Sequence, residues 1–152
     1  KGTKIMLADN LKTLLATEYS WAVKLQFFHW NVEGPDFAQL HGFFAMLYED
    51  VNDNAIDQTA EYIRTLNDYT PGSFERFAEL SEISGQTRVP RARLMIEELL
   101  SDSEKMIALL NQCFDAAESE DQQGIANFIA ERIDAHGKWR WQLRSCVRDQ
   151  RA

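Results

Sequence analysis

The stretch HWNVEGPDFAQLH, which runs from His29 to His41, decides the fold because it separates two long helical patterns. Its Gly34-Pro35 pair ends the first pattern, since proline lacks an amide hydrogen and disturbs the turn before it. Asp36 can cap the helix that follows. The stretch carries two of the chain's three histidines, and imidazole is the commonest side-chain metal ligand near neutral pH. The sequence therefore predicts two helices joined by a short turn, with a candidate metal ligand on either side of it.

Apolar residues repeat at helical spacing along most of the chain. The pattern predicts four long helices, over about 6–30, 37–66, 90–117 and 122–147, and a short helix over 74–80. Pro90 suits the first turn of the third long helix, and no strand pattern competes. This order predicts an all-α, ferritin-like four-helix bundle with a short extra helix in the crossover between the second and third long helices.

Composition narrows the classes of function. The chain has 152 residues, of which 45% are hydrophobic and 26% charged, so we expect one domain over residues 1–152. Its net charge of −8 argues against a protein whose whole surface binds nucleic acid. No apolar run approaches the length of a membrane span, and no signal peptide is visible. We expect a cytoplasmic protein in which Cys113 and Cys146, both beside apolar residues in helical patterns, are buried free thiols.

Three stretches resemble the Dps family, the miniferritins of starved bacterial cells. The first is HWNVEG at His29 with His41 twelve residues on, the second is TPGSFERFAEL at Thr70, which is similar to the family's crossover helix, and the third is HGKWRWQLR at His136. The resemblance implies a hollow dodecamer that oxidises ferrous iron, commonly with hydrogen peroxide, and stores ferric mineral. Many members also coat DNA.

The resemblance also implies a set of metal ligands divided between two subunits. In the family, one subunit supplies two histidines and an aspartate, and its two-fold neighbour supplies an aspartate and a glutamate. His29 and His41 match the histidines, but Ala45 stands where the first aspartate is expected. The neighbour's pair should fall at Ile56 and Ala60, and neither of these side chains can bind a metal.

The next carboxylates, Asp57 and Glu61, stand one residue later and four residues apart, on one face of the second helix. They therefore indicate an insertion of one residue. The apolar pattern agrees, because it steps by three or four residues up to Val51 and then by five to Ile56.

A one-residue π-bulge within residues 49–55 absorbs such an insertion and returns Asp57 and Glu61 to the family's ligand positions. The alternative is a straight helix whose apolar stripe continues through Ala55 and Tyr62 and leaves the two carboxylates solvated.

The length of the helix limits how these ligands can meet. His41 and Asp57 are sixteen residues apart, which is ~24 Å along one helix, so they cannot share a metal within one chain. A shared site needs a second subunit, antiparallel across a two-fold axis. A site inside each bundle, as in larger ferritins, needs Glu-x-x-His pairs that face inward, and the sequence has none.

Iron is the metal expected at such a site, held by neutral imidazole nitrogens and carboxylate oxygens. The loss of a carboxylate at Ala45 should weaken iron binding. Trp30, next to His29, is a candidate catalytic residue that accepts an electron during peroxide chemistry, although a plain packing role is the favoured interpretation. His29 and His41 could also be ordinary polar or interface histidines.

Several further residues admit a structural interpretation. Glu18 lies in the apolar stripe of the first helix, where a subunit-interface ion pair explains it as well as metal binding does. His136, with Trp139 and Trp141, is interpreted as part of the fold and its interfaces. Five acidic residues have two interpretations. We expect them either to line an iron entry pore, as the family resemblance implies, or to form a solvated face: Glu118, Glu120, Asp121, Glu131 and Asp134. DNA binding has support only from two sparse basic ends: Lys1, Lys4, Lys12, Arg144, Arg148 and Arg151.

The sequence thus predicts a miniferritin that oxidises ferrous iron, with peroxide or oxygen, at sites built from His29, His41, Asp57 and Glu61. It stores the ferric product in a hollow homo-oligomer. The alternative is a Dps-like shell or DNA-protecting protein whose ferroxidase centre is degenerate or altered.

Overall fold

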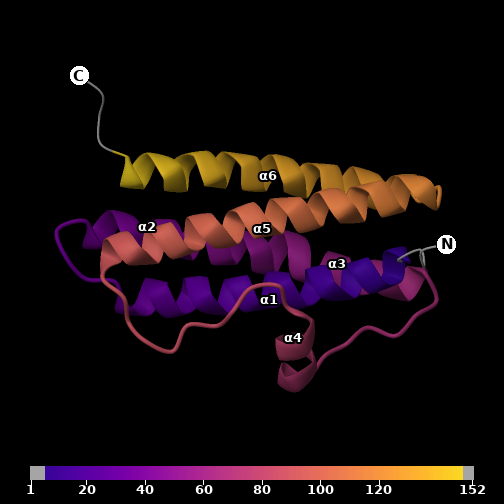
Figure 1. Ribbon diagram of the computed structural model, residues 1–152, viewed down its shortest axis with the longest axis horizontal. Coiled ribbons are helices and arrows are strands. Elements are labelled where there is room, and N and C mark those ends of the chain that lie inside the picture. The colour runs from indigo at the N-terminus through magenta and orange to yellow at the C-terminus, as the bar shows by residue number, and fades with distance from the viewer. Residues whose placement is uncertain (1–5, 149–152) are drawn as a thin grey trace.

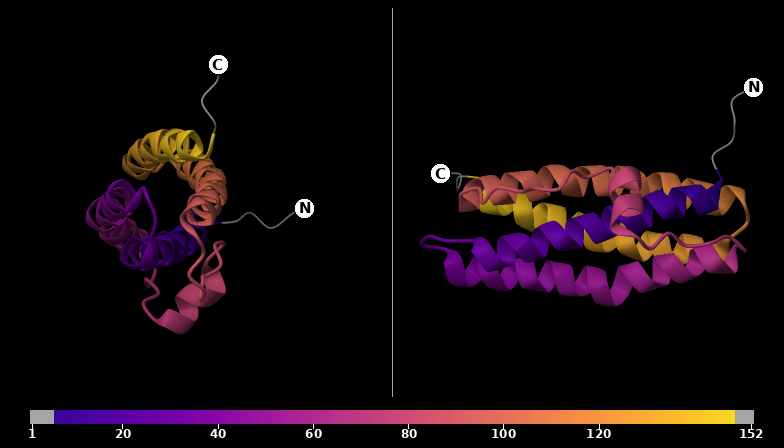
Figure 2. Two further views of the ribbon diagram at one scale, coloured as in Figure 1. Left: turned by 90° about the vertical axis from the view of Figure 1, so that its left-hand side faces the viewer. Right: turned by 90° about the horizontal axis from the view of Figure 1, so that it is seen from below.

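Residues 6–148 are described by the computed structural model, and within them the chain is helical without strands. Four long rods form the bundle and one short helix lies outside it (Figure 1). The helices are α1 Leu7–Asn31, α2 Phe37–Val51 with its continuations η1 Asn52–Ile56 and α3 Asp57–Thr65, α4 Phe74–Leu80, α5 Ala92–Ser119 and α6 Gln123–Val147. The end view shows the rods around a common axis and α4 outside them (Figure 2). The predicted fold class is confirmed.

The apolar stripe predicted for the first helix forms one wall of the core. Each of its members is 0% exposed: Leu7, Leu11, Leu14, Trp21, Leu25 and Phe28. Removing such side chains from water is the main favourable contribution to folding. Ion pairs also join the rods: Lys24 Nζ of α1 lies 2.7 Å from Asp102 Oδ2 and 3.2 Å from Glu98 Oε2 of α5.

The second rod contains the predicted π-bulge, as the π-helical segment η1. Beyond Val51, the buried residues of this rod are Ala55, Thr59 and Ile63, each four residues after the last. In a regular α-helix every four-residue step turns the stripe by about 40°. A stripe with only four-residue steps would therefore rotate away from the core. The wider π turn takes up the extra residue and keeps the stripe inward. The inward position is Ala55 and not Ile56, which is only half-buried.

Deleting Asn54 from η1 should convert the π turn to regular α-helix, because it restores a three-residue step between Val51 and Ala55. We expect the free energy of unfolding to change by less than about 2 kcal/mol. Deleting Met46 from regular α2 is the matched control. It rotates Leu47 and Val51 out of the core and should cost roughly 3–5 kcal/mol. Urea unfolding of both variants makes the comparison, and equal losses would contradict this account of η1.

Two helix starts differ from the sequence prediction. Asp36 precedes α2, but its side chain makes no capping hydrogen bond, because its backbone (φ −99°, ψ 17°) lacks the extended conformation that a cap needs. The chain turns there through the Phe37 N–H, which donates to the Gly34 carbonyl at 3.0 Å. Pro90 lies outside α5, which begins at Ala92 after an extended Arg91. The prediction for Pro90 was therefore wrong.

The crossover helix α4 packs on the outer side of α1. Its start is fixed by the Arg76 N–H, which donates to the Ser73 hydroxyl at 3.1 Å. Its aromatic residues cover Tyr19 of α1, whose ring centroid lies 4.8 Å from that of Phe77. Phe74 remains 77% exposed beside them, so the crossover leaves an apolar surface on this side of the bundle.

The cysteine prediction holds for one residue only. Cys113 is buried, whereas Cys146 is exposed, because it follows Leu143, the last fully buried side chain of α6. Within residues 6–148, no helix is long and apolar enough to cross a membrane. Of the basic residues considered for DNA, Lys1, Lys4 and Arg151 lie outside the described residues.

Candidate metal centre

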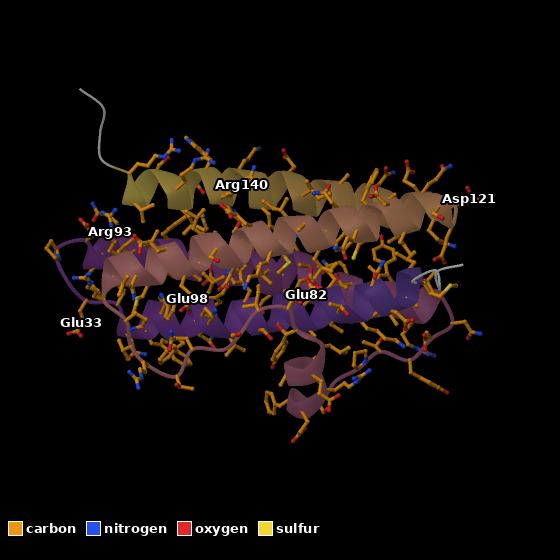
Figure 3. All side chains as sticks on the ribbon, viewed as in Figure 1. Glu33, Glu82, Arg93, Glu98, Asp121 and Arg140 are labelled. Carbon is orange, nitrogen blue, oxygen red and sulfur yellow. The ribbon has the colours of Figure 1, made fainter. Side chains whose placement is uncertain are left out.

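His29 and His41 meet where α1 turns into α2. Each ring nitrogen Nδ1 contacts the other residue's backbone carbonyl, at 2.6 Å for His29 and 2.7 Å for His41. The two rings are stacked with centroids 3.8 Å apart. Glu33 marks the loop at this end of the bundle, and Asp121 marks the opposite end (Figure 3). The turn thus brings together the two histidines that the sequence predicted on either side of it.

These reciprocal hydrogen bonds fix the chemistry of both rings. A carbonyl oxygen only accepts, so each Nδ1 must carry the hydrogen. In the neutral imidazole the lone pair then lies on Nε2, which is the nitrogen available to a metal. Backbone carbonyls that orient histidine ligands in this way are a regular feature of metal sites. The pair is therefore ready to supply two nitrogen ligands.

Aromatic side chains surround the pair but leave it half-buried. The Phe37 ring stacks on His41 with centroids 4.9 Å apart, and the Tyr48 ring meets His29 edge-on at 5.5 Å. Trp30 is 64% exposed, so it does not pack into the core of its own bundle. It lies on the surface next to His29.

The predicted carboxylate ligands lie elsewhere in the chain. Asp57 and Glu61 are exposed on α3 and flank Thr59, which is buried. Residues two positions from an inward residue point to the other side of a helix, so both carboxylates face away from their own bundle. Within residues 6–148, no three His, Cys, Asp or Glu side chains converge as a metal site. Within one chain, the histidines and these carboxylates therefore do not come together.

Ala45 lies one helical turn after His41 on α2 and is half-buried. It contributes no ligand, so the histidine pair has no carboxylate next to it in its own chain. The next acidic side chains along this rod are Glu49, Asp50 and Asp53. Glu49 and Asp53 are exposed, and Asp50 is half-buried and bonded to Arg132.

Glu18 lies inside its own bundle and not at a subunit interface. It is 1% exposed, between rods, next to Thr59 of α3 and Arg132 of α6. Burial raises the pKa of its carboxyl to about 7, and the Thr59 hydroxyl and Arg132 lower it by less. His136 is also enclosed, and burial, aided by Arg132, lowers its pKa to about 3.

The sequence interpretation passed over Arg132. The signal was present, because Arg132 and His136 fall in the heptad-like stripe Ile125, Ile129, Arg132, His136, Trp139 and Leu143, which is buried throughout. Its guanidinium Nη1 donates to Asp50 Oδ1 of α2 at 2.8 Å. The predicted role of His136 and Trp139 in the fold is confirmed, and Trp141 is exposed.

One member of the acidic set has a structural role. Glu120 Oε2, in the turn between α5 and α6, accepts a hydrogen bond from the Leu7 N–H at 2.8 Å. It therefore caps the start of α1. Asp134 lies 3.6 Å from Lys138 one turn along α6, so it is part of an exposed ion pair.

Comparison with known proteins places this bundle among ferritin-like proteins. Residues 8–152 match the model of the ferritin-like domain. A low temperature-induced protein of Nostoc sp. is 37% identical over 138 residues, which is 90% of this chain and 76% of that protein. DNA protection during starvation protein 2 of Bacillus anthracis is 29% identical over 128 residues, 82% of this chain and 87% of that protein.

Solved structures give the same result. The Dps protein of Vibrio cholerae has a TM-score of 0.89 at 25% identity, over 93% of this chain and 89% of that chain. A Dps protein of Bacillus brevis has a TM-score of 0.89 at 26% identity, over 93% and 95% of the two chains. The chain belongs to the ferritin-like superfamily and, within it, to the Dps family.

Proposed function

We propose that this protein is a Dps-like miniferritin that oxidises ferrous iron at sites shared between two subunits. His29 and His41 belong to one subunit, and Asp57 and Glu61 of the partner subunit complete each site. The ferric product is stored in the hollow interior of a homo-oligomer, by family resemblance a dodecamer in the cytoplasm. The family supports iron storage or DNA protection in general, and the shared site is our extension of it.

The observation that carries the proposal is the fixed tautomer of the histidine pair. Nδ1 of each ring is 2.6–2.7 Å from a carbonyl oxygen, so Nε2 is the nitrogen of each half-buried ring that can bind a metal. Two imidazole nitrogens with added carboxylate oxygens suit ferrous iron better than calcium or magnesium. The carboxylates must come from another chain, since Asp57 is ~24 Å from His41 along the rod.

The surface around α1 and α4 supports self-association. A groove of about 360 Å³ between these helices is lined by Tyr19, Val23, Phe77 and Ile83. Trp30 and Phe74 add exposed aromatic surface on the same helices. Extended apolar surface on a monomer commonly marks an interface, and a two-fold interface pairs a surface with its own copy.

The reaction requires two electrons for each peroxide. Two ferrous ions each give up one electron, and hydrogen peroxide takes both, together with two protons, and leaves as two water molecules. The neutral histidines and the carboxylates hold the ferrous substrate. Trp30 is exposed next to His29. When only a single iron is bound, peroxide still needs a second electron, so we propose Trp30 as the donor of that electron and not as the acceptor that the sequence suggested.

A mixing experiment tests whether the sites are shared. His29→Ala/His41→Ala subunits and Asp57→Asn/Glu61→Gln subunits should each be inactive alone. In a mixed pair, one site joins intact histidines to intact carboxylates and the other has neither. Random mixing makes half of the pairs mixed, so we expect roughly a quarter of wild-type ferrous oxidation. If the two inactive proteins stay inactive after they are refolded together, the sites are not shared.

Restoring the missing carboxylate should strengthen iron binding. Ala45 lies one turn from His41, so Ala45→Asp places a charged oxygen ligand beside the pair. An added carboxylate should lower the Kd for ferrous iron by about tenfold. Anaerobic titration calorimetry measures this, with Ala45→Asn as the uncharged control. An equal Kd for wild type and Ala45→Asp would show that iron does not bind at the histidines.

The second candidate function is a shell or DNA-protecting protein without ferroxidase activity. Ala45 is the observation that favours it, because it removes one carboxylate from the family's ligand set. DNA protection is also part of the name of the Bacillus anthracis relative. A protein that assembles and shifts DNA in a gel, but oxidises iron no faster than free solution does, would support this function in place of the first.

A further inference from the structure

The centre of the bundle contains a group of polar side chains that the iron chemistry does not use. We call it the interior polar cluster: Glu18 and Trp21 of α1, Thr59 of α3, and Arg132 and His136 of α6. All five are at most 5% exposed. The cluster therefore lies among three of the rods, and its Thr59 faces inward from the opposite side of α3 to Asp57 and Glu61.

The polar atoms of this cluster do not satisfy one another. In the part of the chain that the structure describes, six of its buried atoms have no hydrogen-bond partner: Glu18 Oε1, Trp21 Nε1, Thr59 Oγ1, Arg132 Nε and Nη2, and His136 Nδ1. Thr59 lies beside the Glu18 carboxyl and influences its pKa, but its hydroxyl lacks hydrogen-bond geometry. Proteins pair nearly all of their buried polar groups with protein atoms or ordered water.

Contacts with neighbouring side chains fix the positions of Arg132 and His136. Arg132 is tied to Asp50 through Nη1 at 2.8 Å, and its guanidinium lies 5.4 Å from the centre of the Trp139 ring. His136 is enclosed by two indoles, with centroids 5.2 Å from Trp21 and 4.8 Å from Trp139. Direct pairing would require these rings and the guanidinium to leave well-packed positions. A small molecule that both donates and accepts would satisfy them where they are.

We propose that ordered water occupies the interior polar cluster and bridges Glu18, Arg132 and His136. Water can accept from the Arg132 and Trp21 N–H groups and donate to Glu18 Oε1 and to a histidine nitrogen. A metal cation does not suit the site, because the Arg132 guanidinium would face it. An anion does not suit it either, because a carboxyl oxygen and an imidazole lone pair would face the anion.

The charge state of Glu18 supports this assignment. Burial raises its pKa to about 7, so near neutral pH a large share of the carboxyl groups carries a proton and can also donate to water. The mixture of donors and acceptors is typical of hydrated buried sites, in which each water makes about three hydrogen bonds.

A crystal structure of the assembled protein at about 1.5 Å resolution tests the proposal. We expect solvent density within hydrogen-bond distance of both Glu18 Oε1 and Arg132 Nε. Direct contact between these atoms without intervening density would overturn the proposal. Density with the anomalous signal of a metal, or with ligand distances near 2.1 Å, would overturn it as well.

Two variants make the test specific. Arg132→Met removes three of the donors and should lose the solvent density, whereas Glu18→Gln keeps the shape and an acceptor and should retain it. Thr17→Val is the matched control, because the Thr17 hydroxyl already bonds to the Thr13 carbonyl at 2.7 Å and the Glu82 N–H at 3.1 Å. Its density at the interior polar cluster should be unchanged. If Glu18→Gln lost the density as fully as Arg132→Met does, the proposed bridge would be wrong.

Discussion

Replacing His29 and His41 together by alanine should lower the rate of ferrous oxidation by on the order of a hundredfold or more. In both rings Nδ1 contacts a backbone carbonyl, which leaves Nε2 to bind a metal, and alanine removes both nitrogens. The partner subunit's carboxylates alone form a weak, oxygen-only site. Stopped-flow absorbance with peroxide, at one ferrous ion per expected site, measures the loss.

The control for this prediction is Gln39→Ala, also on α2 but in the groove shared with Trp141 and Cys146. It should oxidise iron at the wild-type rate. Native mass spectrometry must show equal assembly of all three proteins, since the histidines lie near exposed apolar surface. Wild-type rates in an assembled double variant would place the ferroxidase site elsewhere.

Glu18→Gln and His136→Gln should change the slope of the free energy of unfolding against pH in opposite directions. The folded protein holds a proton on Glu18 that the unfolded chain releases, since burial raises this pKa from 4.5 to about 7. Glu18 therefore makes the free energy of unfolding fall as the pH rises through this range. The folded protein keeps His136 neutral, with its pKa lowered by burial from 6.5 to about 3. His136 makes the free energy of unfolding rise with pH between those values.

The two effects overlap between pH 4.5 and 6.5, where they oppose each other and nearly cancel in the wild type. Glu18→Gln leaves only the histidine effect, so its stability should rise with pH by roughly 1 kcal/mol per unit in this window. His136→Gln leaves only the carboxyl effect and should fall by about as much.

Urea unfolding at pH 4.5, 5.5 and 6.5, at one chain concentration, measures these slopes. Each variant is compared with wild type at the same pH, so titration of exposed groups cancels. Thr17→Val is a suitable control, because it is buried on α1 and does not titrate. Slopes of the same sign in the two variants would contradict the burial of Glu18 and His136 in one core.

The helices of this protein could be predicted from sequence because their apolar spacing is regular. Even the π segment was predictable, since the spacing beyond Val51 departs from that of a regular helix and Asp57 stands one residue late. Its exact inward residue was not predictable. Ala55 and Ile56 are both apolar, and only the surrounding helices decide that the smaller side chain faces the core.

The environment of single polar residues was less predictable. Glu18 lies in an apolar stripe, which shows that it is inward on α1, but the same pattern fits a subunit interface and a bundle interior. Only the position of Arg132 on α6 distinguishes the two. The stacking of His29 on His41 depends on the path of the turn at Gly34, whose φ of 116° is open to glycine. The sequence contains the glycine but not the resulting ring geometry.

The proposed metal ligands differ in the same way in how far they could be predicted. His29 and His41 are only twelve residues apart and a local turn brings them together, so their proximity could be predicted from the sequence. The assignment of Asp57 and Glu61 depends on another subunit, which no pattern within one chain can place. It stays a prediction, supported by their exposure on the outer side of α3.

Iron-soaked crystals test the central claim most directly. Crystals of the assembled protein, soaked anaerobically in ferrous iron, should show anomalous density at the iron edge next to Nε2 of His29 and His41. We predict that Asp57 and Glu61 of the partner subunit complete the same site. Histidines without iron, with the partner's Asp57 and the partner's Glu61 facing solvent, would contradict the account and leave a Dps shell whose ferroxidase centre is lost.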